Sequence, residues 1–83
     1  MNKVLIDLYV PAINKKYDIW IPITRKVGEV INLIIQGINS LNKVNLDFEK
    51  KVYLYNRLTA ERYNNSMRII DTDIRNATDL ILM

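Results

Sequence analysis

VGEVINLIIQGINSL, residues 27–41, is the stretch that decides the fold. At the 100° per residue of an α-helix, its apolar residues fall on one side and its polar residues on the other. The pattern predicts an amphipathic helix with one buried face. Such a helix gains most of its stability by packing on another surface, so the rest of the chain must supply one. The apolar face comprises Val27, Val30, Ile31, Ile34, Ile35, Ile38 and Leu41.

Two glycines, Gly28 and Gly37, lie at opposite edges of that apolar stripe. Each costs about 1 kcal/mol relative to alanine inside a helix. Because a missing side chain lets the backbone approach a neighbouring layer, both glycines are predicted to serve packing.

Two segments before the helix alternate apolar and polar residues, as strands do. They are residues 3–10, KVLIDLYV, and residues 17–21, YDIWI. Pro11 and Asn14 interrupt the pattern between them. Pro22 ends the second run, because it has no amide to donate to a neighbouring strand. The two runs therefore predict a β-hairpin.

The segments after the helix are shorter. Residues 43–50 are predicted to form a loop, residues 51–56 a third strand and residues 58–63 a further short strand. Residues 67–74 carry apolar residues at helical spacing over a length typical of a single or 3₁₀ turn. Residues 79–83, DLILM, predict a last strand.

This order of elements predicts an α+β fold of the β-grasp type. A hairpin feeds a long helix, and a later strand returns beside the first strand. The result is a mixed sheet of four to five strands with one long helix across one face. With 83 residues the chain is expected to form a single domain, residues 1–83, with a thin core.

Composition narrows the function. Cysteine and histidine are both absent, which removes the thiol nucleophile and the commonest general base and metal ligand. No run approaches the ~20 apolar residues of a membrane-spanning helix, and no secretory leader is recognisable. The net charge of +3 comes from scattered basic residues, which is typical of a solvated surface. We expect a cytoplasmic protein that does not span the membrane and is not an enzyme.

Three carboxylates near the C-terminus raise the remaining chemical possibility, a metal site or an acid/base pair. They are Asp71, Asp73 and Asp79. Without histidine or a glycine-bearing calcium loop, the pattern favours carboxylates that cap turns. The sequence predicts no catalytic residues, no metal and no cofactor.

Several short motifs resemble ubiquitin and, more closely, the YukD/EsaB family of ubiquitin-like proteins in type VII secretion systems. IIDTDI at residues 69–74, followed by DLIL at residues 79–82, is similar to the ubiquitin-like ending. YDIWIP at residues 17–22 resembles that family's second strand ending in proline. Ala77 and Thr78 stand where the family commonly has Gly-Asp. The resemblance implies a cytoplasmic accessory role in secretion in low-GC Gram-positive bacteria, with membrane-embedded or ATPase components of the apparatus as partners.

Conjugation by ubiquitin and sulfur carriage by its bacterial relatives need a flexible tail that ends in Gly-Gly. The glycines of this sequence are Gly28 and Gly37, and it ends at Met83. We therefore expect no covalent attachment to targets.

Strand alternation also divides the sheet residues between two faces. The residues expected to face the helix are Val4, Ile6, Leu8, Ile19, Ile21, Val52, Leu54, Leu80 and Leu82. The opposite face is expected to carry Leu5, Tyr9, Trp20, Tyr53, Tyr55 and Ile81. Because Trp and Tyr are enriched at binding hot spots, we predict that these six residues dock onto another protein or a second copy of the chain.

Two alternatives remain for this face. The aromatic residues could pair across strands only to stabilise a half-exposed sheet. They could also stack on single-stranded RNA, which would make the chain a small nucleic-acid-binding regulator. The sequence shows no RNA-binding signature of glycine and aromatic residues on a strand, so nucleic acid is the less favoured partner.

Overall fold

The computed structural model describes residues 2–42 and 51–83, so the loop predicted at residues 43–50 lies outside the described residues. Strand β1 (Lys3–Val10) pairs antiparallel with β2 (Lys15–Pro22), from Lys3 opposite Pro22 to Val10 opposite Lys15. The predicted hairpin is confirmed, and its second strand begins two residues earlier than expected. A 3₁₀ turn (Pro11–Ile13) joins the strands, and the left-handed Asn14 closes it by donating its N–H to the Pro11 carbonyl at 3.1 Å.

Helix α1 (Val27–Asn42) begins where backbone and side-chain acceptors satisfy its first amides. The Lys26 N–H donates to Glu29 Oε1 at 3.3 Å. The N–H groups of Val27 and Gly28 donate to the carbonyls of Met67 and Asn65 at 2.8 and 3.1 Å. The start of the helix is therefore tied to a segment almost forty residues away in the sequence.

The two helical glycines have different surroundings. A Cβ added at Gly28 would lie 3.4 Å from Cβ and from the carbonyl oxygen of Asn65, so the packing role predicted for Gly28 is confirmed. A Cβ added at Gly37 would meet nothing within 4 Å. The packing role predicted for Gly37 is wrong, because this residue lies on the exposed side of the helix.

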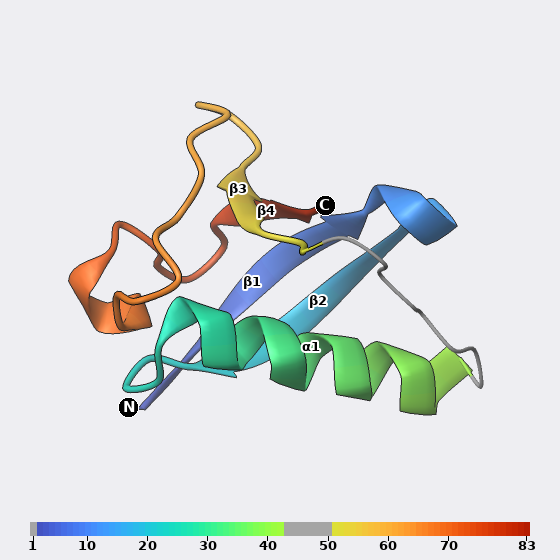
Figure 1. The fold of residues 1–83 in the computed structure, drawn as a ribbon, viewed down its shortest axis with the longest axis horizontal. Coiled ribbons are helices and arrows are strands. Elements are labelled where there is room, and N and C mark those ends of the chain that lie inside the picture. The colour runs from blue at the N-terminus through green and yellow to red at the C-terminus, as the bar shows by residue number, and fades with distance from the viewer. Residues whose placement is uncertain (1, 43–50) are drawn as a thin grey trace.

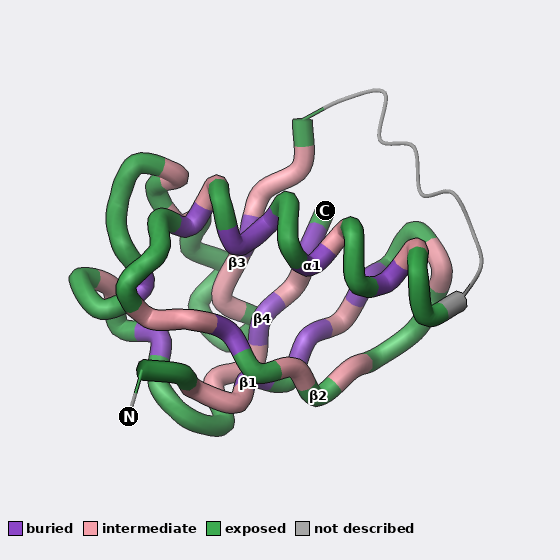
Figure 2. Tube along the Cα trace, turned by 90° about the horizontal axis from the view of Figure 1, so that it is seen from below, coloured by how far each residue is buried: buried purple, intermediate pink, exposed green. Residues whose placement is uncertain are grey.

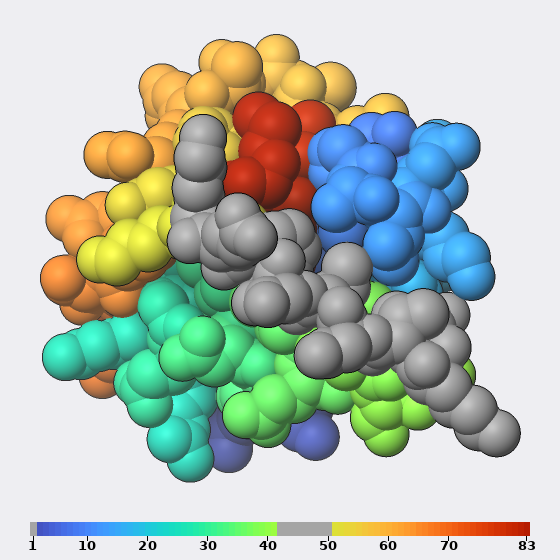
Figure 3. All heavy atoms as spheres, turned by 45° about the vertical axis from the view of Figure 1, so that its right-hand side comes forward, coloured from blue at the N-terminus to red at the C-terminus, as the bar shows by residue number. Residues whose placement is uncertain are grey.

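Two short strands complete the sheet, β3 (Leu54–Asn56) and β4 (Asp79–Leu82). The order is β2-β1-β4-β3, with β4 parallel to β1 and antiparallel to β3. Figure 1 shows the sheet with α1 across one face, and Figure 3 shows β4, in red, between the blue hairpin and the yellow and orange segment that begins at β3. The sheet therefore has the mixed topology expected of a β-grasp fold.

The sheet has four strands among the described residues, so the fifth strand predicted at residues 58–63 is not formed. Asn56 Oδ1 accepts from the N–H groups of Leu58 and Thr59 at 2.8 and 3.1 Å, which turns the chain there. Ala60 adopts a left-handed conformation with φ of 63°. The segment pairs with β3 through a single bridge, between Tyr55 and Arg62. The predicted 3₁₀ turn is present at Ile69–Asp71.

The core lies between α1 and the sheet face that it covers. In Figure 2 the buried positions recur along one side of the helix. Leu41 is the exception to the predicted stripe, because it is 73% exposed at the end of a groove beside β2. The fully or nearly fully buried residues are Ile6, Leu8, Val10, Ile21, Val27, Val30, Ile31, Ile34, Ile38, Leu54, Ile69, Ile74, Leu80 and Leu82. Of the residues predicted to face the helix, Val4, Ile19 and Val52 are partly buried and pack against this core.

In residues 2–42 and 51–83, no helix combines the length and the hydropathy needed to cross a bilayer.

Candidate protein-interaction surface

The face of the sheet that points away from α1, called the outer face below, carries its side chains in rows across the strands. Strand alternation predicts this arrangement, and the register fixes which residues are neighbours. Leu5 lies directly opposite Trp20. Ile81 lies opposite Tyr9 on one side and opposite Tyr55 on the other. The outer face therefore has two apolar rows rather than one continuous patch.

The six residues predicted for docking all lie outside the buried core. Trp20 is 54% exposed, and the other five are half-buried. Tyr9, Ile81 and Tyr55 form one row, called the tyrosine row below. Tyr53 lies beside this row, because its N–H and carbonyl bond to Met83 at 2.9 and 3.1 Å. The register thus brings four of the six predicted residues together and leaves Leu5 and Trp20 apart from them.

Three aspartates separate the two apolar rows. Asp7 lies opposite Asp18 on β2 and opposite Asp79 on β4. A hydrogen bond with the Asp18 carboxyl, partial desolvation and the negative charges of Asp18 and Asp79 raise the pKa of Asp7 above its usual value. This acidic row was not predicted from the sequence. The alternation that places Leu5 and Tyr9 on the outer face also places Asp7 between them. This alternation could have indicated an acidic residue in the middle of the outer face.

Two arginines lie over rings of the predicted surface. The guanidinium carbon of Arg62 is 4.5 Å from the centre of the Tyr53 ring, and that of Arg57 is 5.4 Å from the centre of the Tyr9 ring. Both distances are within the range of cation–π attraction. Sequence reasoning missed these arginines, because the turn after β3 carries them back over the sheet. Arginine, tyrosine and tryptophan are the residue types that dominate binding hot spots.

The segment that carries Arg62 is held in place by Tyr63. The Tyr63 hydroxyl donates to Asp73 Oδ1 at 2.7 Å and accepts from Asn56 Nδ2 at 3.1 Å. Partial burial and the hydrogen bond to the Asp73 carboxylate raise the pKa of Tyr63 to about 12. The arrangement ties the chain directly after Arg62 to β3 and to Asp73.

The carboxylates considered for a metal or acid/base site have separate environments. Asp71 accepts from Arg68 Nε at 3.2 Å, Asp73 accepts from Tyr63, and Asp79 joins the acidic row. Within the described ranges, no group of three or more acidic side chains is arranged to hold a metal ion. The outer face therefore offers rings, guanidinium groups and carboxylates suited to recognition of another surface.

Comparison with known proteins gives a structural likeness and no sequence match. No family model matches the chain, and no curated protein does. Among solved structures, the EccD5 ubiquitin-like domain from Mycobacterium xenopi is 7% identical, with a TM-score of 0.82 over 100% of this chain and 94% of that one. The ubiquitin-like domain of the Mycobacterium tuberculosis type VII secretion system protein ECCD1 is 10% identical, with a TM-score of 0.75 over 99% of this chain and 98% of that one.

A chain of the MycP5-free ESX-5 inner membrane complex is also similar, at 9% identity and a TM-score of 0.72. The match covers 100% of the present chain, which spans 21% of the length of that protein. At these identities the likeness concerns the fold. The chain therefore has the ubiquitin-like β-grasp fold that ubiquitin-like domains of type VII secretion proteins also adopt.

Proposed function

We propose that this chain is a non-enzymatic, cytoplasmic ubiquitin-like interaction module, residues 1–83, that serves a bacterial type VII secretion system. Two lines of support converge on this proposal. The sequence motifs resemble the YukD/EsaB family of Gram-positive bacteria, and the fold is similar to ubiquitin-like domains of type VII secretion proteins. The partners proposed are membrane-embedded or ATPase components of the secretion apparatus.

The observation that carries the docking surface is the tyrosine row. Tyr9, Ile81 and Tyr55 lie side by side on three neighbouring strands, and Arg57 and Arg62 lie over rings at this part of the face. Such half-exposed rings lose water readily when a partner covers them, and the arginines supply directional donors. We assign the contact with the apparatus to this row together with Tyr53. Leu5 and Trp20, which lie across the acidic row, form a second, smaller site that a separate partner can cover.

The acidic row disfavours the nucleic-acid alternative. Asp7, Asp18 and Asp79 lie in the middle of the face on which bases would have to stack, and their charges repel a phosphate backbone. A salt titration separates the two functions. Binding of RNA or DNA that weakens steeply with salt would support a regulator, whereas salt-tolerant binding of a protein supports the proposal.

The test measures binding to purified cytoplasmic domains of the secretion ATPase and of the membrane component encoded beside this protein. Tyr55→Ala and Tyr53→Ala are each expected to weaken binding about 30-fold, the effect of losing a hot-spot residue of about 2 kcal/mol. Leu58→Ala is the control, because Leu58 is 85% exposed and lies in the turn beyond β3, outside the rows. Binding that all three variants leave unchanged would refute this docking surface. A concentration-dependent dimer lost on Tyr55→Ala would identify a second copy as the occupant.

A further inference from the structure

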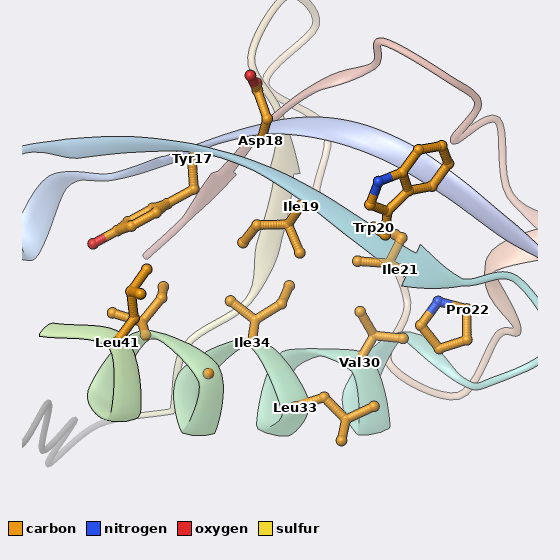
Figure 4. A pocket seen from close by; sticks show the side chains of 12 residues that line it. Tyr17, Asp18, Ile19, Trp20, Ile21, Pro22, Val30, Leu33, Ile34 and Leu41 are labelled. Carbon is orange, nitrogen blue, oxygen red and sulfur yellow. The ribbon is translucent and has the colours of Figure 1, made fainter.

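A second surface lies beside the outer face, in a groove between β2 and α1. The groove has a volume of about 300 Å³. Its floor is apolar and comes from Ile19 and Ile21 on the strand and from Val30 and Ile34 on the helix. Figure 4 shows these side chains pointing toward one another between the two elements.

The rim of the groove is also apolar, although it faces solvent. Trp20 is 54% exposed on the strand side, and Leu33 is 49% exposed on the helix side. Gly37 leaves the helix wall open between Leu33 and Leu41, because nothing lies within 4 Å of the position a Cβ would take. Figure 4 shows the Trp20 ring above β2 and the Leu33 side chain below α1, so exposed apolar side chains flank the hollow on both sides, as is typical of an interaction site.

In the part of the chain that the structure describes, the strand that borders the groove lies at an edge of the sheet. β2 is the outermost strand on its side of the described sheet. The Leu5 carbonyl accepts from the Ala77 N–H and the Asp7 N–H donates to the Thr78 carbonyl, so the backbone groups of Leu5 and Asp7 face away from β2. Their opposite residues on β2 are Trp20 and Asp18.

In an antiparallel pair, two residues that lie opposite each other either direct their N–H and carbonyl groups toward each other or both direct them away from the pair. The N–H and carbonyl groups of Trp20 and Asp18 therefore face away from β1, and those of Lys16 follow at the same two-residue spacing. Pro22 ends this series, because it has no N–H. The edge thus presents three donors and three acceptors at the repeat of a β-strand, directly beside the apolar groove.

We propose that the groove between β2 and α1 binds an extended peptide segment, which pairs with β2 as an additional strand and places alternate apolar side chains between the strand and the helix. Backbone groups repeating along a strand edge are matched by another strand, whose alternate side chains then point to the helix side.

A second copy of the chain fits this edge less well. A two-fold arrangement in which Lys16, Asp18 and Trp20 all bond would place Asp18 directly opposite its own counterpart, and like charges directly opposite destabilise a strand pair. Each Asp18 already lies opposite Asp7 within its own sheet. The two-fold would also bring one groove against another and leave both hollow. A separate peptide avoids both penalties.

The test uses a library of capped heptapeptides that alternate serine with Val, Ile, Leu or Phe at the three inward positions. Binding is followed by the fluorescence of Trp20, the single tryptophan of the chain, and by amide hydrogen exchange. The bound peptide is expected to slow exchange of the Lys16, Asp18 and Trp20 amides. If no member of the library binds at millimolar concentration, the proposal is wrong.

Peptide N-methylation then tests strand pairing without changing the protein. For a peptide that pairs antiparallel to β2, the serines direct their amides to this strand, so their N-methylation should weaken binding at least about tenfold. N-methylation of the apolar residues, whose amides face away from β2, should weaken it less than about threefold. Equal effects of the two modifications would overturn strand addition.

A matched pair of helix variants locates the site. Gly37→Leu fills the groove and should weaken binding at least about tenfold, whereas Gln36→Leu, one residue outside the groove, should leave it within about threefold. Circular dichroism establishes that both variants fold.

A second copy of the chain would be the occupant, and the peptide proposal would be wrong, if the amides of Lys16, Asp18 and Trp20 exchanged slowly without peptide and their protection increased with protein concentration. Tyr55→Ala should leave peptide binding unchanged, because Tyr55 lies in the tyrosine row and not in the groove. The peptide proposal and the proposed docking surface can therefore be refuted separately.

Discussion

Gly37→Ala should stabilise the protein, although glycine-to-alanine changes inside packed structures often do not. Gly37 lies in the middle of α1 on its exposed side, and nothing lies within 4 Å of the new methyl group. The change removes backbone freedom from the unfolded chain without steric cost in the helix. We expect the free energy of unfolding to rise by about 0.5–1 kcal/mol. For a chain of this size, that corresponds to an increase in Tm of about 3–7 °C.

Gly28→Ala is the matched comparison within the same helix. Its methyl group would lie 3.4 Å from two atoms of Asn65, whose carbonyl also accepts the Gly28 N–H. The first turn of a helix gains less from alanine, and the close contact with Asn65 consumes part of that gain. We expect a change in the free energy of unfolding less than half that of Gly37→Ala.

Urea unfolding followed by circular dichroism measures both variants. The midpoint should rise for Gly37→Ala at an unchanged slope, because the same surface is exposed on unfolding. A midpoint for Gly37→Ala that stays at or falls below the wild-type value would refute the reasoning. Such a result would mean that the wall of the groove at Gly37 is occupied or strained.

Three further changes test other parts of the fold. Asp7→Asn should be more stable than wild type at pH 7, because the raised pKa of Asp7 means that the folded state binds its proton more tightly than the unfolded state. The difference should shrink as the pH falls through the raised pKa toward the ordinary one, and a difference that grows in this range would contradict the repulsion from Asp18. Tyr63→Phe should lower the free energy of unfolding by about 1 kcal/mol through loss of the hydrogen bond to Asp73, measured by urea unfolding. Leu80→Ala should cost about 2–5 kcal/mol, because Leu80 is fully buried in β4, and a cost below about 1 kcal/mol in thermal unfolding would place it outside the core.

The helix and the hairpin were predictable from the sequence because their signals are local. The apolar repeat of α1 identifies its buried face from Val27 to Ile38, and the alternation in β1 identifies which of its residues face the helix. Leu41 shows the limit of this reasoning. Its position in the repeat matches that of Ile34, yet it is 73% exposed, so a place in the repeat does not by itself ensure burial.

The third and fifth strands were misjudged because strand length depends on the partner. Residues 51–56 alternate throughout, but the named strand covers Leu54–Asn56, whose partners are Leu80 to Leu82, and the Tyr53–Met83 pair extends the bonding by one residue. Residues 58–63 begin with a turn, since the Asn56 side chain accepts two amides of that segment, and they pair with β3 through the single Tyr55–Arg62 bridge. An asparagine at the end of a strand is a turn signal, and here it outweighs the apolar residues that follow.

The composition of the outer face was predictable, but its division into rows was not. Alternation assigns Leu5, Asp7 and Tyr9 to one face from the sequence of β1 alone. The neighbours of each residue depend on register, which pairs segments more than seventy residues apart, such as Asp7 with Asp79. The arginines over the tyrosine rings depend on a turn whose shape is set by the Asn56 side chain. Contacts of this kind follow from the assembled fold rather than from any local pattern.

The acidic row has a functional consequence if both proposed surfaces are used. Along β1, Leu5 and Tyr9 are four residues apart, about 13 Å at the rise of a strand, and Asp7 lies halfway. Trp20 lies opposite Leu5, which makes it remote from the tyrosine row, and it also lines the groove beside β2. A partner on the tyrosine row that also reached Trp20 would have to cover the carboxylates of Asp7 and Asp18 and bury their charges. Since burying unpaired charge is costly, a partner without basic groups at that point would stop at the acidic row and leave the groove open to a peptide. The same three aspartates that keep the outer face from forming one continuous apolar patch would therefore allow two partners to bind the domain at once.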